Sequence, residues 1–185
     1  MSRDWALQAV FVGAVLTMFA EPARAQEYAV ELGASLASLN VGVGEVNDFT
    51  TLSVPASGFG SLNPGVYASV FVGPRLSIEP QIGFVVASGG EGDTFHIVNV
   101  AGQVNYFLRG TAQSSPYVFG SVGILDYSGG SGDNPVSVSG GAGYRIRVGT
   151  RLTFRFDGRY THFTEDTTGD AVAFTVSIGG LLGER

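Results

Sequence analysis

A hydroxyl, an imidazole and a carboxylate stand close together at His162-Phe163-Thr164-Glu165. Such a set could support acyl transfer, in which the imidazole activates the hydroxyl as a nucleophile and an acid orients the imidazole. Thr is a poorer nucleophile than Ser in that setting. His162 and the second histidine, His96, both fall on the apolar side of their segments and near segment ends, where an interfacial histidine is the ordinary explanation. We therefore predict no catalytic residues and no enzymatic activity.

Cofactor and metal sites have no better support. The stretch Ser128-Gly129-Gly130-Ser131-Gly132-Asp133-Asn134 is glycine-rich, but strands are expected on both sides of it. A phosphate-binding loop needs a helix N-terminus behind it. The chain has no Cys, which excludes thiolate ligands and a cysteine nucleophile. The sequence predicts no cofactor, no cofactor-binding residue and no metal site.

The elements that would position any site are β-strands. From Gln26 onward apolar residues alternate with small or polar ones, and Gly-, Asp- and Ser-rich breaks interrupt the alternation. In the third segment, Leu76–Ala87, Pro80 has no backbone N–H to donate to the neighbouring strand, which predicts a bulge there. In the fifth segment, Tyr117–Tyr127, apolar residues occur on both parities, so the sequence does not show which side chains face outward. The eight expected strands are Tyr28–Leu39, Gly65–Val72, Leu76–Ala87, Phe95–Leu108, Tyr117–Tyr127, Val136–Val148, Leu152–Phe163 and Ala171–Leu182.

Length, composition and spacing favour a membrane barrel. Only 14% of the 185 residues are charged, and the mean hydropathy is +0.24. The connections after the second, fourth and sixth strands are short and the others longer, as in transmembrane barrels. We predict an all-β fold, a closed antiparallel eight-stranded transmembrane β-barrel.

The alternative is an exported soluble β-sandwich or lipocalin-like barrel. In such a protein the polar parity faces water and should be rich in charged residues, whereas here Gly, Ala, Ser, Thr, Asn and Gln dominate it. Aromatic residues expected in interfacial girdles are Tyr106, Tyr117, Tyr127, Tyr160 and Phe163.

The N-terminus predicts export. Arg3 precedes an apolar stretch from Trp5 to Ala20, and Ala23-Arg24-Ala25 offers small residues at the two positions that a signal peptidase reads. The stretch is shorter than the roughly 20 apolar residues of a membrane-spanning helix. We expect residues 1–25 to be a cleaved signal peptide and residues 26–185 to form the outer-membrane β-barrel domain.

Charged residues on the polar parity should point into the barrel. An eight-stranded barrel is only wide enough for side chains to fill, so these groups should meet and pair. We expect a lumen plugged by ion pairs, with a narrow gated pore as the alternative. The inward charges are Glu31, Glu79, Arg145, Arg147, Arg155, Asp157 and Arg159, and all except Asp157 and Arg159 are expected in the periplasmic half.

Several stretches resemble the small outer-membrane barrels of the OmpA-like and opacity-type families. They are Glu31-Leu32-Gly33-Ala34, Pro116–Gly123, Gly140-Gly141-Ala142-Gly143-Tyr144 and the alternating last strand. The resemblance implies an eight-stranded barrel in the bacterial outer membrane, inserted by the assembly machinery. The chain departs from it by ending in Leu181-Leu182-Gly183-Glu184-Arg185 without a terminal aromatic residue, and no segment that could bind peptidoglycan follows the barrel. Members that deacylate lipid A use a His and a Ser two residues apart, and His162 with Thr164 matches that pattern only in part.

The expected function is a structural or surface-interaction role in the envelope, performed by a monomer. Basic residues occur in the three short turns, as Arg75, Arg109 and Arg151. The outer rim should be wholly acidic, so its expected partners are lipopolysaccharide, through shared Ca²⁺ or Mg²⁺, or a basic partner, and no nucleic acid. The acidic residues expected there are Glu45, Asp48, Glu91, Asp93, Asp126, Asp133, Glu165, Asp166 and Asp170.

Overall fold

The computed structural model describes residues 28–43, 50–53, 65–88, 94–128, 135–164 and 170–184, and the regular elements among them are β-strands. Across these ranges there is no helix long and apolar enough to cross a membrane. The predicted signal peptide lies outside the described residues. The strands are β1 (Tyr28–Val43), β2 (Thr50–Ser53), β3 (Val66–Phe71), β4 (Leu76–Ser88), β5 (Thr94–Phe107), β6 (Ser115–Ser128), β7 (Val136–Val148), β8 (Leu152–Phe163) and β9 (Asp170–Glu184).

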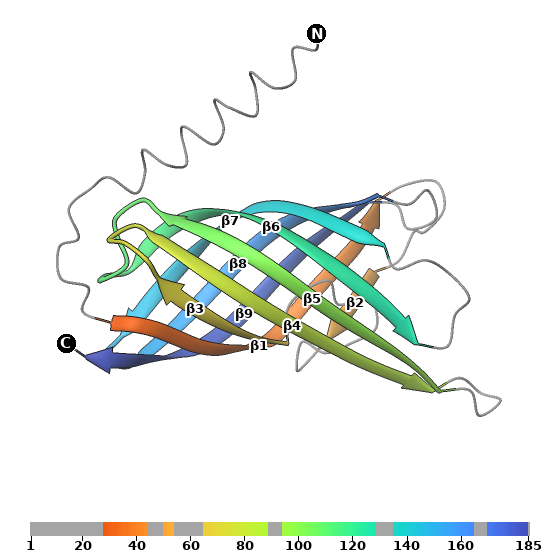
Figure 1. Cartoon of the computed structure of the whole chain (residues 1–185), viewed down its shortest axis with the longest axis horizontal. Helices are drawn as coiled ribbons and strands as arrows, with labels where there is room; N and C mark the ends of the chain where they lie inside the picture. The colour runs from red at the N-terminus through yellow and green to blue at the C-terminus, as the bar shows by residue number, and fades with distance from the viewer. Residues whose placement is uncertain are drawn as a thin grey trace, which may run out of the picture.

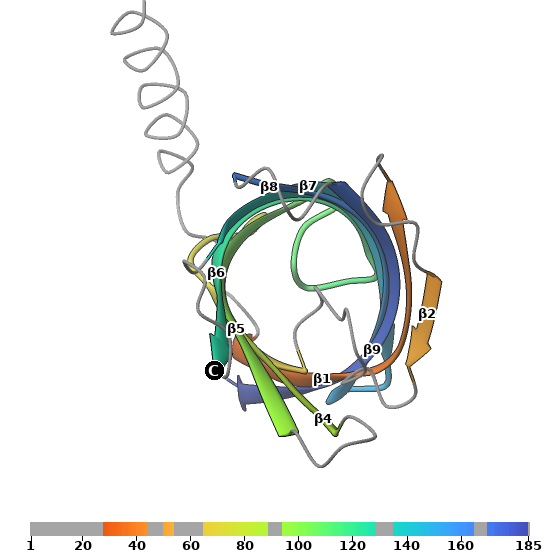
Figure 2. The same ribbon diagram turned by 90° about the vertical axis from the view of Figure 1, so that its right-hand side faces the viewer.

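The strands form one closed antiparallel sheet. From β3 to β9 each strand pairs with the next one in the chain, and β9 returns to pair with β1 (Figure 1). Figure 2 shows the ring that they enclose. We call the end that carries the turns 73–75, 108–114 and 149–151 the turn end, and the opposite end the loop end. The predicted all-β closed antiparallel barrel is confirmed.

Two short strands share one place in the ring. On one edge of β1, β3 pairs with residues 30–34 and β2 pairs with residues 38–41. Nine strands therefore occupy eight positions, in agreement with the predicted count. The sequence does not predict β2, because its four residues, Thr50-Thr51-Leu52-Ser53, are too few to show an alternation.

The barrel is apolar outside and polar inside. Successive side chains of a strand point to opposite faces, so one parity faces outward and the other faces the lumen. Val122 and Phe174 are each 57% exposed on the outer wall, whereas Asn105 and Arg145 are fully buried inside. A soluble β-protein has the reverse arrangement, with its apolar parity buried. The predicted assignment of the two parities is confirmed in the described strands.

Pro80 does not introduce the predicted bulge. The registers of β4 with β3 and with β5 continue through it, and Pro80 lies opposite Gly102. Its ring is exposed on the outer wall, so the missing donor costs one ladder bond without shifting the register. The register shift instead lies in β1, between Ser35 and Ala37, where β1 pairs with β9.

Several aromatic residues fill the lumen, which corrects part of the predicted girdle. Tyr117 is 1% exposed and Phe163 is 7% exposed, so both point inward. Tyr160 does face outward, at 48% exposure. Strand β6 carries Val118 outward and Tyr117 inward, which explains why both of its parities are apolar. The inward cluster at the turn end consists of Phe71, Phe107, Tyr117, Phe119 and Leu181.

Candidate functional site in the barrel interior

Four charged side chains that the sequence predicts to pair inside the barrel do so, towards its turn end. Glu31 comes from β1, Glu79 from β4, Arg145 from β7 and Arg155 from β8. Arg145 Nε donates to Glu31 Oε2 at 2.7 Å. Arg155 Nη1 lies 2.6 Å from Glu79 Oε2 and 4.0 Å from Glu31 Oε1. All four side chains are at most 2% exposed, so the predicted pairs are direct and buried.

Two tyrosines join these ion pairs into one network. The guanidinium carbon of Arg155 lies 4.5 Å from the ring centre of Tyr67 and 5.1 Å from that of Tyr117, within the range of cation–π attraction. Arg155 Nε donates to Tyr117 Oη at 2.9 Å, and Tyr117 Oη donates to Asp157. Tyr67 Oη donates to Glu31 Oε1 at 3.0 Å. Each partner of Arg155 is therefore held by at least one further contact.

Sequence reasoning missed both tyrosines as lumen residues. Each lies directly across from an inward-facing glycine, Tyr67 from Gly33 and Tyr117 from Gly143. A Cβ on Gly33 would lie 2.2 Å from Tyr67 Cζ, and one on Gly143 would lie 2.6 Å from Tyr117 Cζ. The glycines thus make room for the rings. Their pairing with aromatic residues becomes visible only when the register between strands is known.

Amide side chains surround the remaining charges. Glu79 accepts from Gln81 Nε2 at 2.7 Å and from Asn105 Nδ2 at 3.2 Å. Arg159, which lies closer to the loop end, donates to Gln103 Oε1 at 2.5 Å. Hydrogen bonds of this kind satisfy buried charges that would otherwise lose their hydration. The amides expected on the polar parity therefore bond Glu79 and one nitrogen of Arg159, whereas Arg145 Nη2 and Arg159 Nε are buried without a hydrogen-bond partner.

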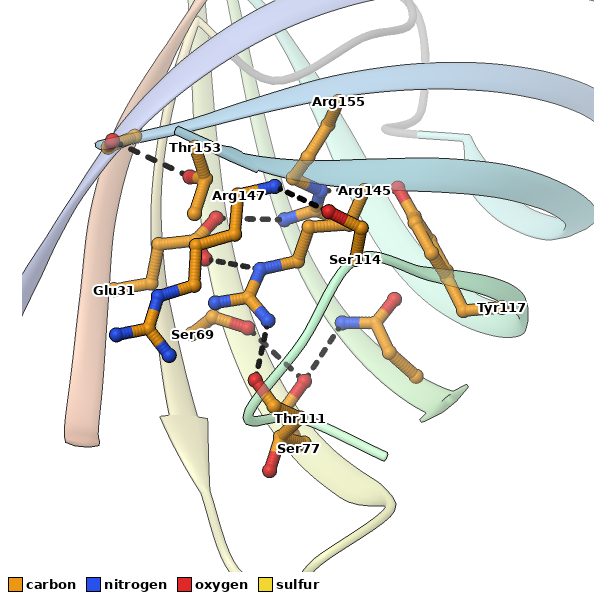
Figure 3. A network of polar contacts seen from close by, with 12 residues as sticks. Glu31, Ser69, Ser77, Thr111, Ser114, Tyr117, Arg145, Arg147, Thr153 and Arg155 are labelled. Atoms are coloured by element: carbon orange, nitrogen blue, oxygen red, sulfur yellow. Dashed lines mark hydrogen bonds and ion pairs between the residues drawn. The ribbon is translucent and has the colours of Figure 1, made fainter. Parts of the chain in front are cut away.

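The turn 108–114 closes over the arginines at the turn end. Arg145 Nη1 donates to the carbonyl oxygen of Thr111 at 2.6 Å, and Arg147 Nη1 donates to that of Ala112 at 2.6 Å. Figure 3 shows Arg145 reaching Thr111, and Figure 2 shows the segment between β5 and β6 curling into the ring. The sequence predicts only a short turn here, because a backbone carbonyl acceptor leaves no signal in residue types.

Little space remains between these groups. A cavity lined by Tyr67, Glu79, Arg155 and Arg159, among others, has a volume of about 10 Å³. That is about the room that one water molecule needs. The space between these four side chains is therefore closely packed.

A second polar cluster lies outside the barrel, at its loop end. His162 Nδ1 lies 2.7 Å from Asp170 Oδ1, and Tyr160 Oη donates to Asp170 Oδ2 at 2.5 Å. The His162 side chain is 62% exposed. Thr164 Oγ1 donates to the carbonyl oxygen of Val136 at 3.2 Å. The carboxylate beside His162 is thus Asp170, and the neighbouring hydroxyl is engaged by the backbone.

Other predicted features fall partly outside the described residues. These include Glu165, residues 129–134 of the glycine-rich stretch, the side chain of His96, and seven of the nine predicted outer acids. Within the described ranges, no three His, Cys, Asp or Glu residues gather as metal ligands would. Arg75, Arg109 and Arg151 are exposed, one in each turn of the turn end, as expected.

No family model matches the chain, and no curated protein matches it. Solved structures of small outer-membrane barrels are similar to it. OprG from Pseudomonas aeruginosa is 9% identical over 87% of this chain and 99% of that one, with a TM-score of 0.54. The outer membrane protein AlkL in DMPC bilayers is 14% identical over 88% and 95%, with a TM-score of 0.52. The N-terminal β-barrel domain of Pseudomonas aeruginosa OprF is 12% identical over 84% and 98%, with a TM-score of 0.51. At these identities the likeness shows the fold, and it confirms the predicted resemblance to small eight-stranded outer-membrane barrels.

Proposed function

We propose that this chain is an outer-membrane barrel with a structural or surface-interaction role in the bacterial envelope, and that ion pairs plug its lumen. The observation that carries the proposal is the buried interior network of ion pairs. Three carboxylates, those of Glu31, Glu79 and Asp157, share it with three guanidinium groups, those of Arg145, Arg155 and Arg159. A barrel with a filled lumen acts through its wall and its rims.

The outer wall supports a place in a lipid bilayer. Large apolar side chains cover it from the turn end towards the loop end, and closure of the sheet leaves no open edge between β9 and β1. On the strands, the outward-facing Asp126, His162 and Asp170 lie near the loop end. On this proposal the loop end faces outward and the turn end faces the periplasm.

A narrow pore is the second candidate, and one observation favours it. Arg155 Nη1 lies 2.6 Å from Glu79 and 4.0 Å from Glu31, so a small movement would exchange its partner. Such an exchange could rearrange the plug. The close packing of the lumen and the turn 108–114 favour the closed form, because both would have to move before ions pass.

Planar-bilayer recording separates the two candidates. We expect the wild-type barrel to give no steady single-channel events, because its lumen is filled. Steady events that Glu79→Ala or Arg155→Ala abolishes would favour the pore. The membrane fraction should be tested first on a detergent gel, where a folded barrel migrates differently before and after heating. Recovery as a soluble periplasmic protein would exclude both candidates.

We further propose that the acidic outer rim is a docking surface for lipopolysaccharide through shared divalent cations. The exposed arginines Arg75, Arg109 and Arg151 lie at the opposite end, so the described part of the rim carries no exposed arginine. Carboxylates are hard oxygen ligands of the kind that Ca²⁺ and Mg²⁺ prefer. Millimolar Ca²⁺ should raise the melting temperature in bilayers that contain lipopolysaccharide. Absence of that shift, together with retention on heparin, would contradict this proposal.

A further inference from the structure

The outer wall contains an apolar groove of about 440 Å³ where β1, β9 and β8 lie side by side. Its volume falls in the range of small-molecule sites. Outward-facing side chains form its sides, and small residues form its floor. The outward-facing lining residues are Ala37, Leu39, Phe156, Gly158, Phe174 and Val176.

Local sequence explains the hollow. Gly158 interrupts a row of large outward side chains on β8, between Phe156 and Tyr160. The ring of Phe174 borders the vacated space, since a Cβ on Gly158 would lie 3.5 Å from Phe174 Cε1. On β1 the groove lies beside the register shift, where Ala37 takes the outward position opposite Val176.

A polar cluster lies beyond the groove on the same strands. Gly158 pairs with Phe174, and His162, four residues further along β8, pairs with Asp170. At about 3.3 Å per residue the cluster stands roughly 13 Å from the groove, towards the loop end. It consists of Tyr160, His162 and Asp170, which hydrogen-bond to one another.

The cluster leaves one group available for a ligand. Asp170 engages His162 Nδ1, and the exposed ring presents its second nitrogen, Nε2, with no partner among the described residues. Because the Asp170 carboxylate accepts from Nδ1, Nε2 is a donor in the doubly protonated ring. An anionic oxygen such as that of a phosphate is a suitable acceptor.

The groove and the cluster together fit an amphiphile whose apolar chain lies in the middle of the outer wall and whose polar head group lies at the loop end. We propose that this face binds one phosphate-bearing membrane lipid, with an acyl chain in the groove and its phosphate at His162. The inference rests on the proposed membrane placement of the barrel. A lipid of the leaflet at the loop end has this orientation already, whereas a second barrel would bring a convex wall that does not reach the floor at Gly158.

Native mass spectrometry of the barrel, released from nanodiscs that hold phosphatidylglycerol and a phosphate-free galactosyl diacylglycerol, tests this. We expect the wild type to retain one lipid, mainly phosphatidylglycerol. Gly158→Leu should lose the bound lipid because its side chain fills the groove. Gly140→Leu is the matched control: it is another outward strand glycine, and it lies outside the groove. It should retain lipid like the wild type.

A third variant, His162→Phe, should still retain a lipid but lose the preference for the phosphate-bearing one. Equal retention by Gly158→Leu and Gly140→Leu would overturn the proposal, as would retention of two barrels in one particle that only Gly158→Leu separates. Insertion into the nanodiscs is scored for every variant. Insertion without lipid retention contradicts the lipid site alone, whereas failure of the wild type to insert contradicts the proposed function.

Discussion

Single residues in the lumen combine into a network that depends on charge balance. Arg145 pairs with Glu31 and also lies 5.2 Å from the ring centre of Phe71 and 5.6 Å from that of Phe107. Its charge is thus compensated by one carboxylate and two aromatic faces. Loss of the carboxylate would leave a buried cation without its main partner.

We expect Glu31→Ala to lower the free energy of unfolding by about 3–5 kcal/mol, because it leaves Arg145 buried and unpaired. Urea titration of the folded barrel in lipid vesicles measures this as a lower midpoint. The double variant Glu31→Leu with Arg145→Met should recover much of the loss, since it removes both charges. Arg109→Ala, in an exposed turn, is the control. An unchanged midpoint for Glu31→Ala would mean that the lumen is hydrated.

A second expectation concerns the space that Gly33 leaves for Tyr67. Gly33→Ala should destabilise the barrel by about 1–3 kcal/mol, because the added methyl group overpacks against the ring. Tyr67→Ala should rescue that variant in part. Gly120→Ala adds the same group on the outer wall, where the nearest heavy atom would lie 3.9 Å away, and should have little effect. Equal urea midpoints for the two alanine variants would contradict the packing argument.

At the scale of elements, the turn between β5 and β6 is a folded part of the plug. Its Thr111 amide donates to the carbonyl oxygen of Pro74 at 2.8 Å, and the carbonyl oxygen of Thr111 accepts from Arg145. Arg147 holds the next carbonyl, that of Ala112, and its own amide donates to Ser114 Oγ at 2.9 Å. The turn is therefore fixed to β7 and to the neighbouring turn.

Arg147→Ala should loosen this turn without unfolding the barrel. We expect faster hydrogen exchange of the Thr111 amide and easier proteolysis within residues 108–114, because the hydrogen bond to Ala112 is lost. Arg151→Ala, in the adjacent turn, serves as the control. Unaltered protection of Thr111 in the Arg147 variant would show that its bond to the Pro74 carbonyl and the bond from Arg145 suffice to hold the turn.

The strands could be predicted because a two-residue period shows directly in the sequence, and the inward charges follow from that parity. The number of strand positions and the meeting of Glu31, Glu79, Arg145 and Arg155 therefore needed no structure. The inward direction of Tyr117 could not be predicted, because an aromatic near a strand end suits either an interface or a core. The hydrogen bond from Arg147 to the turn could not be predicted from the sequence either, because its acceptor is a backbone carbonyl oxygen.

At the scale of the whole molecule, the charges differ between the two ends. The turn end carries the exposed arginines, and the described outward carboxylates of Asp126 and Asp170 lie at the loop end. This difference in charge agrees with the proposed orientation, in which the loop end faces outward and the turn end faces the periplasm. Export itself depends on the signal peptide at residues 1–25, which is predicted from the sequence alone.

We expect the mature protein to begin at Gln26, because Ala23 and Ala25 provide the small residues that a signal peptidase requires. Mass spectrometry of the protein from the membrane fraction measures the mature N-terminus. Ala25→Arg should block cleavage and leave a heavier precursor. A mature chain that still carries the apolar stretch from Trp5 to Ala20 would identify that stretch as an anchor.

The pairing of β1 with β9 closes the ring. Tyr28 lies opposite Glu184, and Val43 lies opposite Asp170, so β1 and β9 are paired as fully as consecutive strands are. The hydrogen bonding around the ring therefore does not distinguish the strands at the two ends of the chain from consecutive strands. A circular permutant that joins Glu184 to Tyr28 through a short linker and opens the chain between β6 and β7 would keep every strand pairing. The covalent break between the two terminal strands is thus incidental to the architecture of the barrel.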